Sequence, residues 1–298
     1  MDVLDEPAVQ QRLHYQDLIP VIAEALAALS SGKVVQPVRA VLPVAPHRGF
    51  FAVMPAYADG GAGAGGLGAK LVTFYPHNVG IHTHHAVIVL FKAETGEPLA
   101  VMDGRLITEM RTAAASAVAT QRLARVDASV LAILGSGVQA KSHLAALRHV
   151  RSFKEVRVWS PRNAPAFAQR HGVKATATAE DAVRGADVVV VAASATTPIL
   201  HGRWLSPGTH VNAIGATRPE WRELDDDLVT RARVFVDSRE AALRESGDVI
   251  AARSEVTEIG AVVAGTDPGR RSAEELTLFK SVGVAVEDVA AAALVLRA

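Results

Sequence analysis

The chain contains no cysteine, which excludes disulfides, thiolate nucleophiles, iron–sulfur clusters and cysteine-based zinc sites. Lysine plus arginine equals aspartate plus glutamate at 31 each, so no excess charge points to nucleic acid or to an anionic membrane. No apolar run reaches the roughly 18 residues that span a bilayer. The acidic N-terminal segment also lacks the layout of a secretory signal. We therefore expect a cytoplasmic protein that binds small molecules.

The apolar residues are numerous, at 49% of 298 residues, and their spacing predicts two lobes. Residues 16–30 are spaced as an amphipathic helix that ends at Gly32. Mostly extended segments follow as far as residue 104, with a hairpin that turns at residues 94–97. The glycine-rich stretch at 59–68 has no strand before it and no helix after it, so we expect a surface loop and no phosphate cradle.

From Ser129 onward the predicted strands and helices alternate, after a helix of small residues at 112–124. Such alternation indicates an α/β domain with a doubly wound parallel sheet, the Rossmann arrangement. An alanine-rich helix from about residue 284 ends the chain, and we expect it to return to the first lobe.

A dinucleotide-binding turn follows the first strand of this second lobe, in the order Gly135, Ser136, Gly137, Val138, Gln139 and Ala140. Gly135 can make the tight turn, and Gly137 lets a pyrophosphate approach the backbone. Ala140 occupies the position where helix and strand touch, and the helix N-terminus offers unpaired N–H groups. An ordinary glycine-containing turn is the alternative, but the order of strand, turn, helix and strand favours a cofactor site.

The end of the next strand determines the expected nucleotide. An NAD site has an acidic residue there for the ribose 2′-hydroxyl, whereas this chain has Trp159, Ser160, Pro161, Arg162 and Asn163. A hydroxyl and a guanidinium suit a 2′-phosphate, so we predict NADPH.

Three cations of the first lobe, Arg39, Lys70 and Arg111, could converge on one substrate carboxylate. On the residues alone, three solvated surface charges are the simpler interpretation. The three histidines at 82, 84 and 85 lack a carboxylate or cysteine that would complete a metal site, so no metal is expected.

At this point the sequence resembles the ornithine cyclodeaminase and mu-crystallin family, and within it the mu-crystallin (ketimine reductase) branch. The matching stretches keep their order over nearly the whole chain: QPVRAVLPVAPHRGF, VMPAY, KLVTFY, AVMDGRLIT, RTAA, ILGSGVQA, FKEVRVW, PGTHVNAIGATRPEWRELDD, VDSREAALRESGDV and FKSVGVAVED.

The resemblance implies a homodimer of two-domain subunits with catalysis in the cleft between the domains. Residues 1–112, joined by the C-terminal helix at 284–298, would form an α+β substrate-binding and dimerisation domain. Residues 113–283 would form the Rossmann domain that binds NADPH.

The resemblance also assigns residues by motif. Those implied to act on the substrate are Arg39, Lys70, Arg111, Thr217 and Glu245. Those implied to line the cofactor are Thr83, His84, Arg111, Thr112, Gly135, Ser136, Gly137, Val138, Gln139, Ser160, Arg162, Asn163, Ser194, Thr196, Ile214, Val282 and Gly283.

One departure from the family pattern bears on the reaction. Cyclodeaminases and related alanine dehydrogenases carry an aspartate where this chain has Thr217, and a threonine hydroxyl cannot act as a base near neutral pH. The mu-crystallin branch likewise has a small hydroxyl residue there.

The resulting prediction is an enzyme that transfers hydride from NADPH to the C=N carbon of an imino carboxylate, preferably a cyclic ketimine. Glu245 would stabilise the iminium cation. Three alternatives remain: reductive amination of 2-oxo acids, an ornithine-type cyclodeaminase with bound NAD, and a non-enzymatic protein that binds iodothyronine-type ligands.

Overall fold

The computed structural model describes residues 1–59 and 65–298, and these form two compact units. Unit 1 comprises residues 1–111 and 284–298, and unit 2 comprises residues 112–283. The boundary between residues 111 and 112 falls inside one continuous helix, α3 (Arg105–Leu123). No helix of the described residues is long and apolar enough to cross a membrane.

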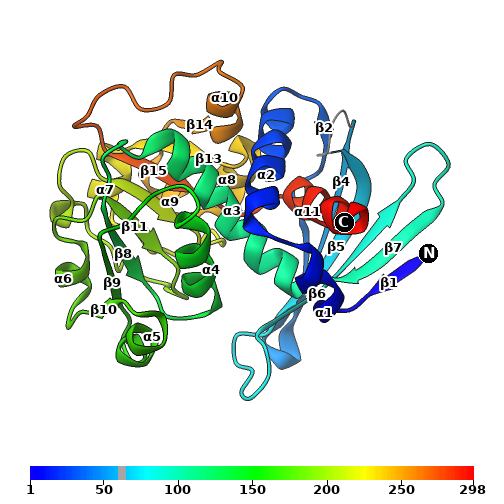
Figure 1. The fold of residues 1–298 in the computed structure, drawn as a ribbon, viewed down its shortest axis with the longest axis horizontal. Helices are drawn as coiled ribbons and strands as arrows, with labels where there is room; N and C mark the ends of the chain where they lie inside the picture. The colour runs from blue at the N-terminus through cyan, green and yellow to red at the C-terminus, as the bar shows by residue number, and fades with distance from the viewer. Residues whose placement is uncertain (60–64) are drawn as a thin grey trace. The chain divides into compact units, whose positions relative to one another are not determined.

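Unit 1 is built on a mixed sheet, which among the described residues has seven strands in the order β1-β7-β6-β5-β4-β2, with β3 also paired to β4. Among the described residues, the paired strands of this sheet run antiparallel, except β1 and β7, which run parallel (Figure 1). The strands are β1 (Asp2–Leu4), β2 (Val34–Val35), β3 (Ala40–Val44), β4 (Gly49–Ala58), β5 (Gly66–Phe74), β6 (His84–Phe91) and β7 (Pro98–Asp103). The helical segments of this unit, besides the start of α3, are α1 (Glu6–Arg12), α2 (Tyr15–Ser30), η1 (Ala45–His47) and α11 (Ala285–Arg297).

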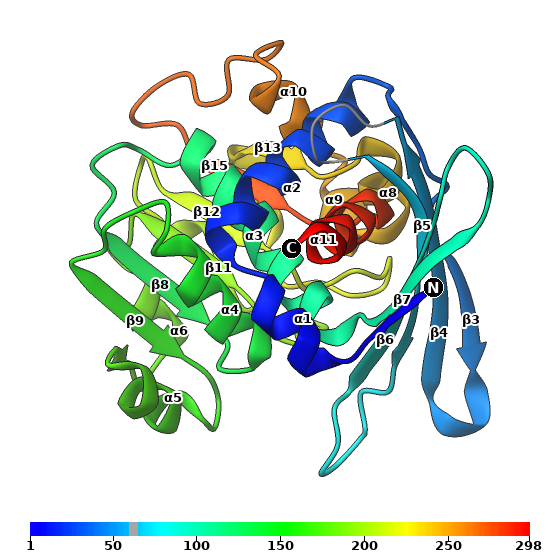
Figure 2. The ribbon, with the colours of Figure 1, turned by 45° about the vertical axis from the view of Figure 1, so that its right-hand side comes forward.

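The two faces of this sheet differ because strand side chains alternate in direction. One face carries the cross-strand row Met54, Lys70, Ile88 and Met102, all buried, and helix α11 packs against β4, β5 and β6. Helix α2 lies beside α11 (Figure 2). The core of unit 1 therefore lies between these helices and one face of the sheet.

Two boundaries in unit 1 differ from the sequence prediction. Residues 66–68, expected in the glycine-rich loop, begin β5, and a side chain at Gly68 would lie 2.5 Å from the carbonyl oxygen of Val89. Residues 60–64 of the expected loop lie outside the described residues. Helix α3 begins at Arg105 and not at residue 112, because the Asp103 carboxylate accepts the Arg105 N–H (2.9 Å) and starts the helix early.

Unit 2 is a parallel sheet with eight strands among the described residues, in the order β10-β9-β8-β11-β12-β15-β13-β14. The chain moves from β8 outward to β10 and then crosses to β11 on the other side of β8. The topological switch point therefore lies between β8 and β11, where doubly wound proteins bind their ligands. The strands are β8 (Val130–Leu134), β9 (Glu155–Trp159), β10 (Lys174–Ala175), β11 (Val188–Val191), β12 (His210–Ala213), β13 (Arg233–Val236), β14 (Val256–Glu258) and β15 (Thr277–Lys280).

Helices cover both faces of the unit 2 sheet. They are α4 (Val138–Leu147), α5 (Ala164–His171), α6 (Ala179–Val183), η2 (Gly202–Trp204), α7 (Asp226–Arg231), α8 (Arg239–Glu245), α9 (Gly247–Ala252) and α10 (Ile259–Val263). One apolar core joins α6, α7, α8 and α9 to the strands. On the opposite face the Asn212 amide donates to the Thr120 hydroxyl of α3 (2.8 Å). The predicted fold class, a doubly wound parallel sheet with a second α+β unit, is confirmed.

Candidate active site

Most of the predicted site residues of unit 2 lie at one edge of its sheet. Because the strands run parallel, their carboxyl ends meet at the same edge. The residues that follow these ends are Gly135, Ser136, Gly137, Val138 and Gln139 after β8, Ser160, Arg162 and Asn163 after β9, Ser194 and Thr196 after β11, Ile214 and Thr217 after β12, and Val282 and Gly283 after β15.

The turn after β8 has the geometry that a dinucleotide needs. Gly135 has φ of +131°, and a Cβ there would overlap the carbonyl oxygen of Ala192 from the neighbouring strand. Gly137 is the N-cap of α4, and no heavy atom lies within 4 Å of the place where its Cβ would stand. No side chain caps α4. The start of the helix therefore has no side-chain cap, which suits a helix N-terminus that binds phosphate.

Ser160 lies directly beside this turn. Its hydroxyl is 2.9 Å from the Ser136 hydroxyl and accepts the backbone N–H of Asn163 (3.1 Å). Trp159 ends β9, and no residue from 160 to 163 is acidic. Arg162 and Asn163 are exposed. The end of β9 therefore offers hydroxyl and guanidinium donors near the turn and no carboxylate for a ribose 2′-hydroxyl.

Unit 1 holds a buried cluster of ion pairs around Lys70 of β5 and Arg111 of α3. Lys70 Nζ lies 2.7 Å from Asp288 Oδ2, and Arg111 donates from Nε to Asp288 Oδ1 at 2.9 Å. Arg111 Nη1 donates to Glu287 Oε2 at 2.6 Å. Lys70 is 1% exposed and Arg111 is 5% exposed. The interpretation of these two residues as solvated surface charges is therefore wrong, because α11 buries and pairs them.

Burial and mutual repulsion set the protonation of this cluster. Burial lowers the pKa of Lys70 to about 8, the Asp288 carboxylate opposes that shift, and Arg111 and Arg39 add to it. Desolvation, followed by the charges of Lys70 and Arg111, lowers the pKa of His84 to about 4 although part of its surface is exposed. His84 is therefore neutral at pH 7 beside charged Lys70 and Arg111.

The two acidic residues of this cluster were not predicted from the sequence. Glu287 and Asp288 lie in the first turn of α11, where acidic residues are expected from the helix dipole alone. Both side chains are fully buried. No local signal distinguishes such a pair from a solvated one, because their partners Lys70 and Arg111 are remote in sequence.

The remaining predicted residues lie at or near the ends of elements, except Thr112, which lies within α3. Arg39 is half-buried just before β3, Thr83 precedes β6, and Thr112 is buried in the part of α3 that belongs to unit 2. Thr217 follows Ala216, which has a left-handed φ of +49°, and Glu245 is the last residue of α8.

A third residue that the sequence analysis missed, Asp237 at the end of β13, holds the segment after β15. Its Oδ2 accepts the Ser281 hydroxyl (2.9 Å) and the N–H groups of Val282 (2.9 Å) and Gly283 (2.6 Å). Its Oδ1 accepts the Ser238 N–H at 2.9 Å. The backbone of the predicted nucleotide-binding pair Val282 and Gly283 is therefore anchored to the neighbouring strand.

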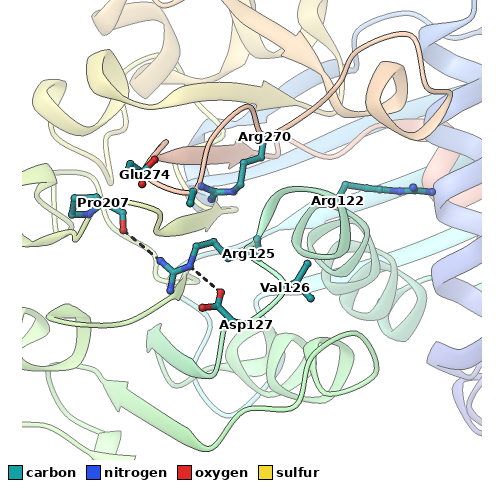
Figure 3. A pocket seen from close by; sticks show the side chains of 9 residues that line it. Arg122, Arg125, Val126, Asp127, Pro207, Arg270 and Glu274 are labelled. Carbon is teal, nitrogen blue, oxygen red and sulfur yellow. Dashed lines mark hydrogen bonds and ion pairs between the residues drawn. The ribbon is translucent and has the colours of Figure 1, made fainter.

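A hollow of unit 2, about 670 Å³ in volume, lies elsewhere, beside the amino end of β8 (Figure 3). Two of its arginines are already engaged: Arg125 pairs with Asp127 and Asp187, and Arg270 donates to the carbonyl oxygens of Leu123 and Gly208. These two arginines bind loops at the edge of the unit 2 sheet opposite the dinucleotide turn. This hollow therefore does not match the predicted site.

Within residues 1–59 and 65–298, no group of three or more histidine, aspartate or glutamate side chains could hold a metal ion. His82 and His85 meet edge-on with ring centroids 6.1 Å apart, and His84 stacks on Phe74.

Comparisons with known proteins agree with this geometry. The family model described as ornithine cyclodeaminase/mu-crystallin family matches residues 1–297. Ketimine reductase mu-crystallin of Mus musculus is 48% identical over 303 residues, covering 98% of this chain and 95% of that protein. The structure of Thermococcus litoralis Δ1-pyrroline-2-carboxylate reductase with NADH and L-proline superposes with a TM-score of 0.93 at 35% identity, covering 100% and 97% of the chains. An archaeal alanine dehydrogenase dimer with bound NAD gives a TM-score of 0.92 at 34% identity, covering 100% and 95%. The chain therefore belongs to the ornithine cyclodeaminase/mu-crystallin family.

Proposed function

We propose that this protein uses NADPH to reduce the C=N bond of small α-imino carboxylates, preferably cyclic ketimines. The observation that carries the proposal is the buried cation cluster of Lys70 and Arg111, whose positions are held by carboxylates of α11. The reaction also needs a bound nucleotide, and the turn after β8 in unit 2 supports its binding. Relatives named as a ketimine reductase and a pyrroline-2-carboxylate reductase support the same reaction class.

The charges of the cluster suit a single carboxylate. Lys70, Arg111 and the nearby Arg39 carry three positive charges, and Glu287 and Asp288 carry two negative charges. One positive charge remains in excess, which one substrate carboxylate would balance. A guanidinium can bind a carboxylate through hydrogen bonds from more than one nitrogen, and the carboxylates of α11 hold that of Arg111 in place. In this proposal the cluster binds the substrate and orients its reacting face.

The chain's residues position and polarise the imine. A reduced nicotinamide would supply a hydride to the carbon of an imine whose nitrogen has already taken a proton from solvent, and the product is the amine. We assign to Glu245 the electrostatic stabilisation of the protonated imine. Thr217 has an uncharged hydroxyl that cannot serve as a base near neutral pH, which favours reduction over deamination.

The choice of NADPH rests on the end of β9. The Ser160 hydroxyl beside the turn, the exposed Arg162 and the lack of an acidic residue from 160 to 163 all suit a 2′-phosphate. The two solved relatives are described with NADH and with NAD, so the nucleotide preference needs its own test. We expect a higher kcat/KM with NADPH than with NADH, and we expect Ser160→Asp to reverse the order. An NADH preference in the unaltered protein would contradict this assignment.

The reaction itself is tested by following NADPH oxidation with five- and six-membered cyclic imino acids at mildly acidic and neutral pH. We expect oxidation that depends on the imine. Absence of turnover with every imine, together with release of ammonia and proline from ornithine, would refute the proposal. Reductive amination is a second candidate, favoured by the similarity to alanine dehydrogenase, and pyruvate with ammonia or methylamine tests it.

We also propose a homodimer that covers the second face of the unit 1 sheet. This face exposes apolar side chains on adjacent strands, including Leu42 (62% exposed), Val87 (41%), Tyr57 (37%) and Leu71 (36%). An exposed apolar patch of this kind marks an interaction surface, and the related alanine dehydrogenase is described as a dimer. We expect sedimentation to give a dimer mass and Leu71→Glu with Val87→Glu to give a monomer. A monomeric unaltered protein would contradict this assembly.

A further inference from the structure

The unit 2 sheet contains a buried ionic cluster that the proposed chemistry does not use. Lys280 Nζ, at the end of β15, lies 2.6 Å from Glu223 Oε1 and 3.5 Å from Asp248 Oδ2. All three side chains have no exposed surface. Lys280 also donates to the carbonyl oxygen of Gly215. The cluster thus lies at the carboxyl edge of the sheet, the edge that carries the dinucleotide turn.

Stability alone does not explain such a cluster. Moving charged groups out of water is costly, and well-packed apolar residues in place of a buried ion pair often leave a protein as stable or more stable. The cluster instead has a geometric effect, because a charge-assisted hydrogen bond fixes both the distance and the direction of its partners.

The cluster fixes the loop that carries Thr217. Lys280 binds the Gly215 carbonyl from one side, and a Cβ on Gly215 would overlap Glu223 Oε2 and lie 2.6 Å from the carbonyl oxygen of Ala193. The next residue, Ala216, adopts a left-handed φ of +49°, which costs energy for a residue with a side chain. The Gly215–Thr217 backbone is therefore held in one unusual conformation by Lys280 and Glu223.

The same cluster joins two further loops of this edge. Asp248 Oδ1 accepts the backbone N–H groups of Glu223 (3.0 Å) and Leu224 (3.1 Å), and Asp248 follows the α8 end that carries Glu245. The backbone N–H of Gly247 donates to the Arg218 carbonyl.

The chain beside Glu223 extends this connection to the loop after β11. The backbone N–H of Arg222 donates to the Thr196 carbonyl. The loops bearing Thr196, Thr217 and Glu245 are therefore all bonded to the segment at 218–223 that the buried cluster anchors.

We propose that Lys280, Glu223 and Asp248 are positioning residues that hold the Ile214–Thr217 loop and its neighbours in the arrangement required for hydride transfer. This inference rests on the proposed imine reduction. None of the three is assigned contact with substrate or cofactor, and each acts through the backbone that it binds.

The charges around Glu223 make this role sensitive to pH. Lys280 from β15 and Asp248 from α9 face the carboxyl group, and Arg222 pairs with Asp248 at 3.1 Å. Burial, with the Asp248 charge, raises the pKa of Glu223 to about 7, and Lys280 opposes the shift. Protonation of Glu223 weakens its bond to Lys280, so hydride transfer should slow as pH falls through about 7.

The test uses Lys280→Met and the isosteric Glu223→Gln, with Asp187→Asn as the matched control. Asp187 binds Arg125 and the N–H groups of Ser129 and Val130 at the opposite edge of the same sheet. Single-turnover rates with deuterated NADPH report hydride transfer, and a fluorescence titration reports the Kd for NADPH.

We expect both cluster variants to lower the hydride-transfer rate about tenfold or more, since small misplacements of a reacting group are costly. The isotope effect should increase while the Kd for NADPH changes by less than about threefold. In Glu223→Gln the fall in rate near pH 7 should disappear, and Asp187→Asn should lose stability without a change in isotope effect. Wild-type rates and an unaltered pH profile in Glu223→Gln would overturn the proposal, even if Lys280→Met fails to fold.

Hydrogen exchange separates this inference from the proposed reaction. We expect faster exchange of the amides at 214–219 in Glu223→Gln than in the wild type, which requires no substrate. If wild-type protein reduces no imine but the exchange responds, the proposed function fails and the loop anchoring stands. If imines are reduced and exchange at 214–219 is unchanged, the positioning role is refuted.

Discussion

Lys70 lies in a cross-strand row with Met54, Ile88 and Met102, where an ammonium group has little access to water. Burial of this kind favours the neutral amine, and the Asp288 carboxylate keeps the charged form accessible. The pKa of about 8 means that Lys70 is mostly charged at pH 7 and loses its charge just above it. Its affinity for a substrate carboxylate should therefore depend on pH.

Substitution of Lys70 by Met should raise KM and lower kcat for imino acids. The expected loss in kcat/KM is about 10- to 100-fold, which corresponds to the roughly 1.5–3 kcal/mol of a hydrogen bond to a charged group. In the unaltered protein KM should rise as pH increases through about 8, and this rise should be absent in the variant. Steady-state kinetics across pH 6 to 9 measures both effects.

The exposed Lys92, just after β6, supplies the matched control. Lys92→Met should leave kcat/KM unchanged, and thermal unfolding should show that both variants fold. An unchanged kcat/KM in Lys70→Met would show that Lys70 does not anchor the substrate.

Among the elements, the link between β15 and α11 depends on a neighbouring strand. Asp237 at the end of β13 accepts one hydroxyl and two backbone N–H groups on a single oxygen. The segment at 281–283 contains the proposed nucleotide contacts, so Asp237 would support the site through the backbone that it binds.

Replacement of Asp237 by Ala should therefore weaken nucleotide binding and stability together. Buried N–H groups that lose their acceptor cost about 1–3 kcal/mol each, so we expect a lower free energy of unfolding and a higher Kd for NADPH. Denaturant unfolding and a fluorescence titration measure the two effects. Asp267→Ala, which removes the partner of Arg233 away from this link, serves as the control. Equal Kd values in the two variants would contradict the anchoring role.

The element boundaries that the sequence analysis missed have local tertiary causes. Helix α3 begins at Arg105 because the Asp103 carboxylate binds the Arg105 N–H, whereas the sequence pattern ended the extended segments at residue 104 and began the helix only at residue 112. Residues 67 and 68 pair with β6 because Gly68 permits the close approach of the Val89 carbonyl. The sequence alone does not distinguish a glycine in a strand from a glycine in a loop, because the distinction depends on the strand that lies beside it.

At the scale of the molecule, two buried histidines of unit 2 link stability to pH. His143 Nδ1 donates to the Gln139 carbonyl (2.8 Å), so its Nε2 accepts from the Ser116 hydroxyl (2.9 Å) and the ring is neutral. Burial lowers the pKa of His143 to about 4 and that of His210 to about 3.

Acid should therefore destabilise the fold between pH 6.5 and about 4. In this range the unfolded histidines bind protons and the folded ones do not, so stability falls as pH decreases. At pH 5 each histidine should cost roughly 2 kcal/mol relative to pH 7.5. Urea unfolding at several pH values measures this slope, and His143→Gln should reduce it by the share of one histidine. His77 is exposed, so the control His77→Gln should keep the pH dependence of the unaltered protein. If His143→Gln also kept that pH dependence, the prediction would be wrong.

Several features of this protein follow from the sequence by itself. The Gly135–Ala140 turn, the alternation of strands and helices after Ser129 and the lack of an acid after Trp159 are local patterns, and local backbone and side-chain chemistry suffices to interpret them. The family assignment rests on motifs in the same order along the chain.

The tertiary structure alone decided which charges are buried and paired. Arg111 and Asp288 are 177 positions apart, and the Lys280–Glu223 pair is separated by 57. No local pattern distinguishes such residues from solvated ones, since the free energy of a charge depends on what surrounds it in space. Packing against α11 buries Lys70 and Arg111 and pairs them with its carboxylates. Burial beside the Gly215 loop lets Glu223 and Lys280 hold that loop in the proposed positioning role.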